Sequence, residues 1–250
     1  MRTHPPTFFS SLCRLAVLGS FALPLAASAG IFTSTYTTGF ANGGVIPDGS
    51  VAGWSDTRTI SGLGSAPIVN VTMTLDVSGG YNGDLYAYLS YNGTIIPLLN
   101  RVGVGTGNAF GSADAGFNIT LSSAAATDIH LASAGGSQLT GTYQPDGRTI
   151  DPLSAPASFD AASRVSFHAL DGMNANGNWT LFFADVTASD EHSTINGYSI
   201  SVEVVPEPVT AALGICLAVW AGGQGWLALR KLQRARLLGG ATNPSSHAKL

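Results

Sequence analysis

The feature that most constrains the fold of this chain is a strict alternation of apolar and polar residues in segment 67–77. Its apolar positions are Val69, Val71, Met73, Leu75 and Val77, and the positions between them are Asn70, Thr72, Thr74 and Asp76. Because successive side chains of a strand point to opposite faces of a sheet, the segment is predicted to be a strand with one face on a core.

Similar short runs, separated by Gly, Asn, Asp and Ser, fill the middle of the chain, and none has apolar residues at helical spacing. Segment 84–99 is predicted to be a hairpin, since Asn92-Gly93 supplies the positive φ angles of a tight turn. Further strands are predicted at 118–121, 164–168, 179–185 and 198–204. Roughly seven or eight strands without helices between them predict an all-β fold, a jelly-roll or galactose-binding-like β-sandwich.

The N-terminal residues 1–29 are predicted to be a secretory signal peptide. Arg2 and Arg14 precede an apolar run that ends in Ala27-Ser28-Ala29, the small-x-small pattern that signal peptidase cleaves. An uncleaved membrane anchor is the alternative, but the apolar run, which Pro24 interrupts, is shorter than the roughly 20 residues that span a bilayer. We therefore expect the mature chain to begin at Gly30.

Residues 209–229 carry no formal charge and predict one C-terminal transmembrane helix, although Gln224 and several glycines make the segment only moderately apolar. Basic residues follow it directly: Arg230, Lys231, Arg234 and Arg236. By the positive-inside rule this cluster stays in the cytoplasm, so that 237–250 is a cytoplasmic tail and 30–208 lies outside. A buried amphipathic helix is the alternative, but no polar stripe runs through the segment.

The region between these ends is acidic and contains no cysteine. From Gly30 to Val205 it has four basic and fourteen acidic residues, a net charge of −10, which disfavours nucleic acid as a partner. Cys13 and Cys216 lie in the two terminal segments. The exported part therefore depends on packing or on bound ions rather than on disulfides.

Several motifs in residues 43–204 resemble, in order, the P domain (P/Homo B domain) of proprotein convertases. They are Ile46-Pro47-Asp48, Tyr81-Asn82-Gly83-Asp84-Leu85, Tyr91-Asn92-Gly93-Thr94, Asn176-Gly177-Asn178-Trp179-Thr180-Leu181 and Asn196-Gly197-Tyr198-Ser199-Ile200. Tyr91-Asn92, Phe183 and Tyr198 depart from the usual Ser-Pro, Val and Trp but keep a turn or a large apolar group. The resemblance implies a jelly-roll sandwich over 43–205, preceded by an N-terminal segment at 30–42.

In proteases such a domain packs beside a subtilisin-like catalytic domain, for which this sequence has no counterpart. His130, His168 and His192 lie in no subtilisin-like motif, and no serine lies in Gly-x-Ser-x-Gly. We therefore expect no enzymatic activity from the chain itself.

The C-terminal region 205–236 resembles the PEP-CTERM sorting signal of Gram-negative bacteria, which an exosortase recognises and processes. The resemblance rests on Val205-Pro206-Glu207-Pro208, followed by an apolar helix and the basic cluster. Proline keeps the motif extended, which suits entry into a peptidase active site. An ordinary linker before a membrane anchor is the alternative.

Acidic residues in two turns are the candidate ligands for a structural calcium ion: Asp84, Asp185, Asp190 and Glu191. Their carboxylates are the ligands that calcium prefers, but an Asp in a Gly-rich turn also serves simply to accept backbone hydrogen bonds.

Trp179 alternates with Leu181 and Phe183 and is predicted to lie in the core, whereas the position of Trp54 is left open.

These features together predict a non-catalytic protein of the cell surface or extracellular matrix. It would pass through the inner membrane, be processed by signal peptidase and exosortase, and contact a protein or an exopolysaccharide through its sandwich. The alternative is an accessory P domain that acts on a subtilisin-like endopeptidase supplied by another chain.

Overall fold

The computed structural model of the protein describes residues 29–205 and 208–239. These residues form nine strands and one long helix, joined by loops and short 3-10 turns. The strands are β1 (Gly30–Tyr36), β2 (Ser50–Ile60), β3 (Ile68–Ser78), β4 (Leu85–Tyr91), β5 (Thr94–Asn100), β6 (Phe117–Ser122), β7 (Leu139–Tyr143), β8 (Gly177–Asp185) and β9 (Thr194–Val204), and the helix is α1 (Pro208–Gly239). The signal peptide predicted at 1–29 lies, except for Ala29, outside the described residues.

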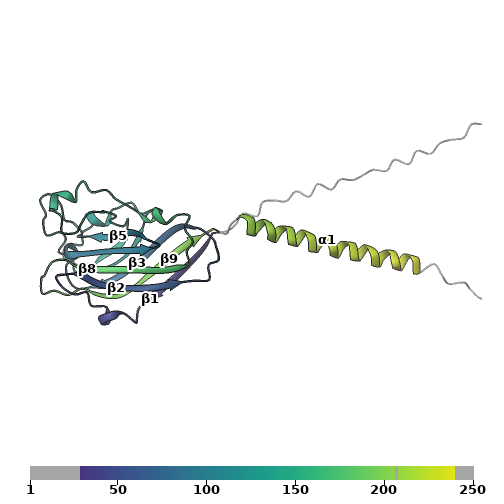
Figure 1. Cartoon of the computed structure of the whole chain (residues 1–250), viewed down its shortest axis with the longest axis horizontal. Coiled ribbons are helices and arrows are strands. Elements are labelled where there is room, and N and C mark those ends of the chain that lie inside the picture. The colour runs from purple at the N-terminus through teal and green to yellow at the C-terminus, as the bar shows by residue number, and fades with distance from the viewer. Residues whose placement is uncertain (1–28, 206–207, 240–250) are drawn as a thin grey trace, which may run out of the picture.

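The strands make two sheets that pack face to face, which confirms the predicted β-sandwich (Figure 1). One sheet has the order β1-β9-β3-β6-β7 and the other β2-β8-β4-β5. Neighbouring strands are antiparallel except β6 and β7, which are parallel. The chain crosses repeatedly between the sheets, so that residues far apart in sequence meet in the core.

The core between the sheets is apolar and rich in aromatic residues. Trp179 is completely buried, as predicted, and its ring stacks on Tyr91 at a centroid distance of 4.0 Å. Its Nε1 donates a hydrogen bond to the Ala175 carbonyl at 3.1 Å, so the one polar atom of the ring is satisfied. Trp54, left open by the sequence, is buried as well and donates to the Ala41 carbonyl at 2.9 Å.

The predicted hairpin forms with the expected turn. Asn92 and Gly93 join β4 to β5 with φ angles of 47° and 80°, both in the left-handed region that a two-residue turn of this kind requires.

Strand β3 also forms, but its alternation is shifted at the start. Ile68 is buried and Val69 is exposed, because the pairing with β9 has an irregularity between Ile68 and Asn70.

The strand predicted at 164–168 is wrong. Arg164 makes only an isolated bridge to Arg148, and residues Phe167–Leu170 form a 3-10 turn that Ser166 precedes. The Ser166 side chain accepts a hydrogen bond from the His168 amide and so caps the turn. Phe167 is buried in this turn rather than in a sheet.

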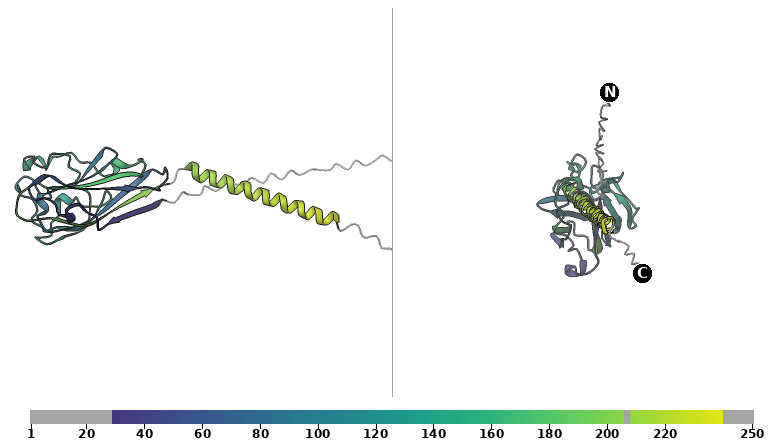
Figure 2. Two further views of the ribbon diagram at one scale, coloured as in Figure 1. Left: turned by 60° about the horizontal axis from the view of Figure 1, so that its bottom comes forward. Right: turned by 90° about the vertical axis from the view of Figure 1, so that its right-hand side faces the viewer.

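Residues 30–42, expected to precede the domain, contribute β1 to the sandwich. All seven residues of β1 pair with β9, from Gly30 opposite Val204 to Tyr36 opposite Tyr198. Both ends of the sandwich sequence therefore lie at the same end of the molecule, next to α1 (Figure 2). The opposite end, here called the distal end, consists of loops at Asp48, Asp84 and Asp185.

A helix forms over the predicted 209–229 and continues to Gly239, through the basic cluster. Among the described residues, however, no helix is both long enough and apolar enough to cross a bilayer. The prediction of a transmembrane helix is corrected accordingly, since Gln224 and glycines 214, 222, 223 and 225 dilute the apolar side chains of this segment. Most of the tail predicted at 237–250 lies outside the described residues.

Candidate functional site

Three aromatic side chains lie together on the outer face of the four-stranded sheet. Alternation along β4 places Leu85, Ala87 and Leu89 in the core, so Tyr86 and Tyr88 project outward. Phe182 lies opposite Tyr88 on the neighbouring strand β8, and these two rings stack at 4.7 Å. Tyr86 lies 5.9 Å from Tyr88 and 6.4 Å from Phe182 between ring centroids. We call Tyr86, Tyr88 and Phe182 the aromatic platform.

The platform is held in place by the strand beside it. At Gly53 on β2, a Cβ atom would meet the Phe183 carbonyl oxygen at 2.1 Å and the tip of the Phe182 ring at 2.7 Å. The missing side chain therefore allows the tip of the Phe182 ring to approach the backbone of β2 closely. All three rings are half-buried and keep part of their surface in solvent.

A hollow of about 370 Å³ adjoins the platform. Asp151 lies in it with the exposed side chains of Val51 and Leu153. Burial raises the pKa of Tyr86, and the nearby Tyr88 and Asp151 raise it further, so the hydroxyl of Tyr86 stays protonated at neutral pH. The surface thus combines apolar ring faces with a hydroxyl donor and a carboxylate acceptor.

Several carboxylates lie together at the distal end, and two of them, Asp84 and Asp185, are among the predicted calcium ligands. Asp84 is the last residue of the turn Asn82–Asp84, and Asp185 ends β8, where it lies opposite Leu85. Burial raises the pKa of Asp185 to about 6, and the negative charges of Asp84 and Asp48 add to the effect. The pKa of Asp84 is also raised, again chiefly by burial, although Thr187 and Arg101 oppose the shift.

The other two predicted calcium ligands lie elsewhere on the same loop. Asp190 and Glu191 are both exposed, and Asp190 has a left-handed φ of 57°. The Asp190 amide donates to the Asp48 carboxylate at 3.3 Å, which is the behaviour of a turn residue. Within 29–205 and the described part of α1, no three His, Cys, Asp or Glu side chains converge to hold a metal ion.

A buried network around His130 escaped the sequence analysis. Its Nδ1 lies 2.7 Å from Asp146 Oδ2, and its Nε2 lies 2.8 Å from the Val104 carbonyl oxygen. Arg148 bridges Asp146 and Asp128 at 3.1 and 2.9 Å. His130 is 4% exposed, and both of its ring nitrogens have partners within the protein. The network joins the loops that follow β5, β6 and β7.

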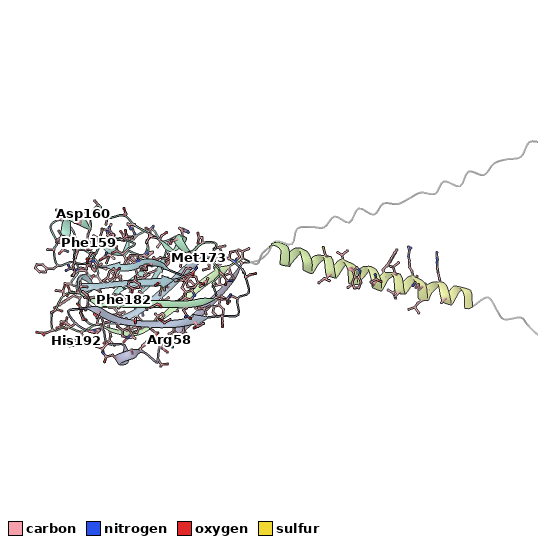
Figure 3. The ribbon with its side chains drawn as sticks, in the orientation of Figure 1. Arg58, Phe159, Asp160, Met173, Phe182 and His192 are labelled. Carbon is pink, nitrogen blue, oxygen red and sulfur yellow. The ribbon has the colours of Figure 1, made fainter. Side chains whose placement is uncertain are left out.

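The other two histidines of the sandwich, His168 and His192, lie on the surface. His168 is exposed and pairs with Asp171 on the same turn at 3.0 Å. His192 is exposed at the distal end, remote from α1 (Figure 3). The structure does not bring His130, His168 and His192 together into one site.

The sorting motif is described only in part. Val205 follows β9 directly, Pro206 and Glu207 lie outside the described residues, and Pro208 is the first residue of α1, a position that suits proline. Arg230, Lys231 and Arg234 lie on α1, and the guanidinium of Arg230 is 3.8 Å from the centre of the Trp226 ring. The side chain of Arg236 lies outside the described part of the chain.

No protein-family model matches the sequence, and no curated protein matches it. Two solved structures are similar to part of the chain: the serine protease of Aeromonas sobria, and the complex of Aeromonas sobria serine protease with the chaperone ORF2. Each match has 13% identity and a TM-score of 0.40, and they cover 71% and 72% of this chain. The chain spans only 27% of the length of each matched chain, and similarity this weak carries no functional argument.

Proposed function

We propose that this chain is an exported, non-catalytic binding protein of the surface or extracellular matrix of a Gram-negative bacterium. Its jelly-roll sandwich would bind a neutral polysaccharide on the aromatic platform. The observation that carries the proposal is the group of three adjoining rings, Tyr86, Tyr88 and Phe182, beside the Asp151 hollow. The chain passes repeatedly from one sheet to the other and stays in one sheet only from β4 to β5 and from β6 to β7, which supports the jelly-roll assignment.

The chemistry of a neutral sugar matches this surface. The C–H faces of a pyranose ring are apolar and pack on aromatic rings, whereas the hydroxyl groups at its edge donate and accept hydrogen bonds. Tyr86 and Asp151 supply such groups next to the rings. The net charge of −10 between Gly30 and Val205 repels anionic polymers, which favours a neutral glycan over an acidic one.

Export and sorting rest on the sequence of the two ends. Signal peptidase would remove 1–29, and an exosortase would process the chain at Val205-Pro206-Glu207-Pro208. The helical region that begins at Pro208 and the arginines and lysine along it support this order of motif, helix and basic cluster. The alternative partner, a subtilisin-like endopeptidase on another chain, rests on the P-domain resemblance alone.

Binding can be tested by titrating the full-length chain with soluble neutral and acidic polysaccharides in a calorimeter. We expect binding to a neutral glycan, weakened about tenfold or more by Tyr88→Ala, equivalent to about 1.4 kcal/mol. Phe110→Ala is the matched control, because Phe110 is 83% exposed and lies outside the platform. Failure to bind any neutral glycan, or equal losses in both variants, would contradict the proposal.

A further inference from the structure

Three buried oxygen atoms at the distal end have no hydrogen-bond partner among the described residues: Asn82 Oδ1, Asp185 Oδ2 and Ser189 Oγ. Asp185 is 0% exposed; its Oδ1 accepts a hydrogen bond from the Thr187 amide at 3.3 Å, but its Oδ2 has none. The Ser189 Oγ, four residues further along the same loop, is also buried without a partner. Burial of an unpaired carboxylate oxygen is costly, so these atoms indicate a ligand that the protein itself does not supply.

The surroundings of Asp185 are negatively charged. Asp84 lies beside it, since the Asp84 carbonyl accepts the Val186 amide at 2.9 Å, and the nearby Thr187 lowers the pKa of the Asp84 carboxyl. Asp48 adds a third carboxylate near the pair and accepts the Ser189 amide at 3.1 Å.

Arg101 and His192 are the basic side chains near this cluster. The Nε of Arg101 donates to the Gly83 carbonyl at 3.1 Å, and its guanidinium lowers the pKa of Asp84, whereas His192 lies near Asp185. The structure places neither within salt-bridge distance of Asp84 or Asp185. Among the described residues, no salt bridge therefore neutralises Asp48, Asp84 or Asp185.

Part of the cluster borders a hollow of about 340 Å³, which is lined by Asp84, Thr187 and Ser189 together with Tyr81 and Phe110. Asp185 is buried and does not line this hollow. We propose that Asp84 and Asp185, with the hydroxyl groups of Thr187 and Ser189, bind one calcium ion between the buried Asp185 carboxylate and this hollow. Water would complete the coordination, and Asp48 would hold the loop in place.

Calcium fits better than other divalent cations. It accepts six to eight oxygen ligands in flexible geometry, whereas magnesium requires a near-ideal octahedron and zinc prefers His or Cys. The ligands proposed here are all oxygens from two loops, and only two of them are carboxylates, in agreement with the lack of a convergent group of three. This set differs from the one predicted by sequence, because the exposed Asp190 and Glu191 are excluded.

The first test measures the melting temperature of the full-length chain in chelator and in millimolar calcium, with sodium at matched ionic strength. An ion that binds only the folded state at about 100 times its Kd should raise the melting temperature by about 5–10 °C. Sodium should not reproduce this rise, since it only screens charge. Equal shifts with calcium and sodium would overturn the site.

A second readout does not depend on stability. Terbium occupies calcium sites and emits when a nearby aromatic ring is excited, and Tyr81 lines the hollow. We expect terbium emission on excitation of tyrosine and its displacement by calcium. Emission that calcium does not displace would contradict the assignment.

Variants then distinguish the two possible sets of ligands. Asp185→Asn should abolish the calcium-dependent rise yet melt no lower than the wild type in chelator, because it removes an unpaired buried charge. Asp84→Asn should also lose the calcium response. Asp190→Asn and Glu191→Gln, exposed carboxylates on the same loop, are the matched controls and should keep it. A response that survives Asp185→Asn, or that disappears in Asp190→Asn, would refute the proposal. None of these outcomes depends on glycan binding.

Discussion

Trp179 on β8 connects the neighbouring strand β4 of the same sheet with the loop before β8. Its ring stacks on Tyr91, whose hydroxyl donates to the carbonyls of Asn174 and Asn176, at 2.9 Å in the second case. The same segment carries Ala175, the acceptor of the indole N–H. One buried ring therefore fixes β8, β4 and the loop before β8 relative to one another.

Removal of this ring should be among the most destabilising single changes in the sandwich. Trp179→Ala leaves a large cavity in a fully buried position, so we expect a loss of about 3–5 kcal/mol in the free energy of unfolding. Urea denaturation measures it. Trp220→Ala is the matched control, because Trp220 is 67% exposed on α1, outside the sandwich. A loss below about 1 kcal/mol for Trp179→Ala would show that the core collapses around the gap.

The alternation of apolar and polar residues predicted which side chains are buried. It did not predict which residues from distant parts of the sequence come into contact. The alternation along β9 placed Tyr198, Ile200, Val202 and Val204 on one face, and all four are buried. The pairing of Asp48 with Ser189, 141 residues away, has no local signal. It arises from the close approach of two loops, where a Cβ atom on Gly49 would lie 2.8 Å from that of Ala188.

Among the strands, β1 is the one whose place in the sandwich the sequence does not indicate. Its sequence, from Gly30 to Tyr36, alternates weakly and is mostly exposed, as expected for an edge strand. Yet β1 covers one side of β9 along seven residue pairs, and Tyr36 packs on Tyr198 with a centroid distance of 5.0 Å. Without β1, the backbone of β9 would become an unpaired edge.

A truncation tests this contribution. We expect a fragment 43–205 to melt at a lower temperature than a fragment 30–205 and to self-associate, because exposed strand edges pair with other chains. Size-exclusion chromatography and thermal melting followed by circular dichroism measure both effects. The full-length chain serves as the reference for 30–205. Two fragments that melt together as monomers would mean that β1 is dispensable.

At the scale of the whole molecule, the two predicted processing sites lie at the same end of the sandwich. Gly30, the predicted first residue of the mature chain, pairs with Val204, which directly precedes the sorting motif. Cleavage at both sites would thus leave every strand complete. Asp84 precedes β4 and Asp185 ends β8 at the distal end. This end of the sandwich lies away from α1 (Figures 1 and 2).

This arrangement predicts the form in which the protein reaches the cell surface. Mass spectrometry of the mature protein from its native host should find Gly30 at the N-terminus and a C-terminus within or next to Val205-Pro206-Glu207-Pro208. Cleavage is expected there because the motif leaves the sheet at Val205, and its prolines cannot extend the pairing of β9. As a control, a strain that lacks the processing peptidase should retain the helix. A mature surface form that still contains 209–229 would contradict exosortase processing and favour an ordinary linker in front of a retained helix.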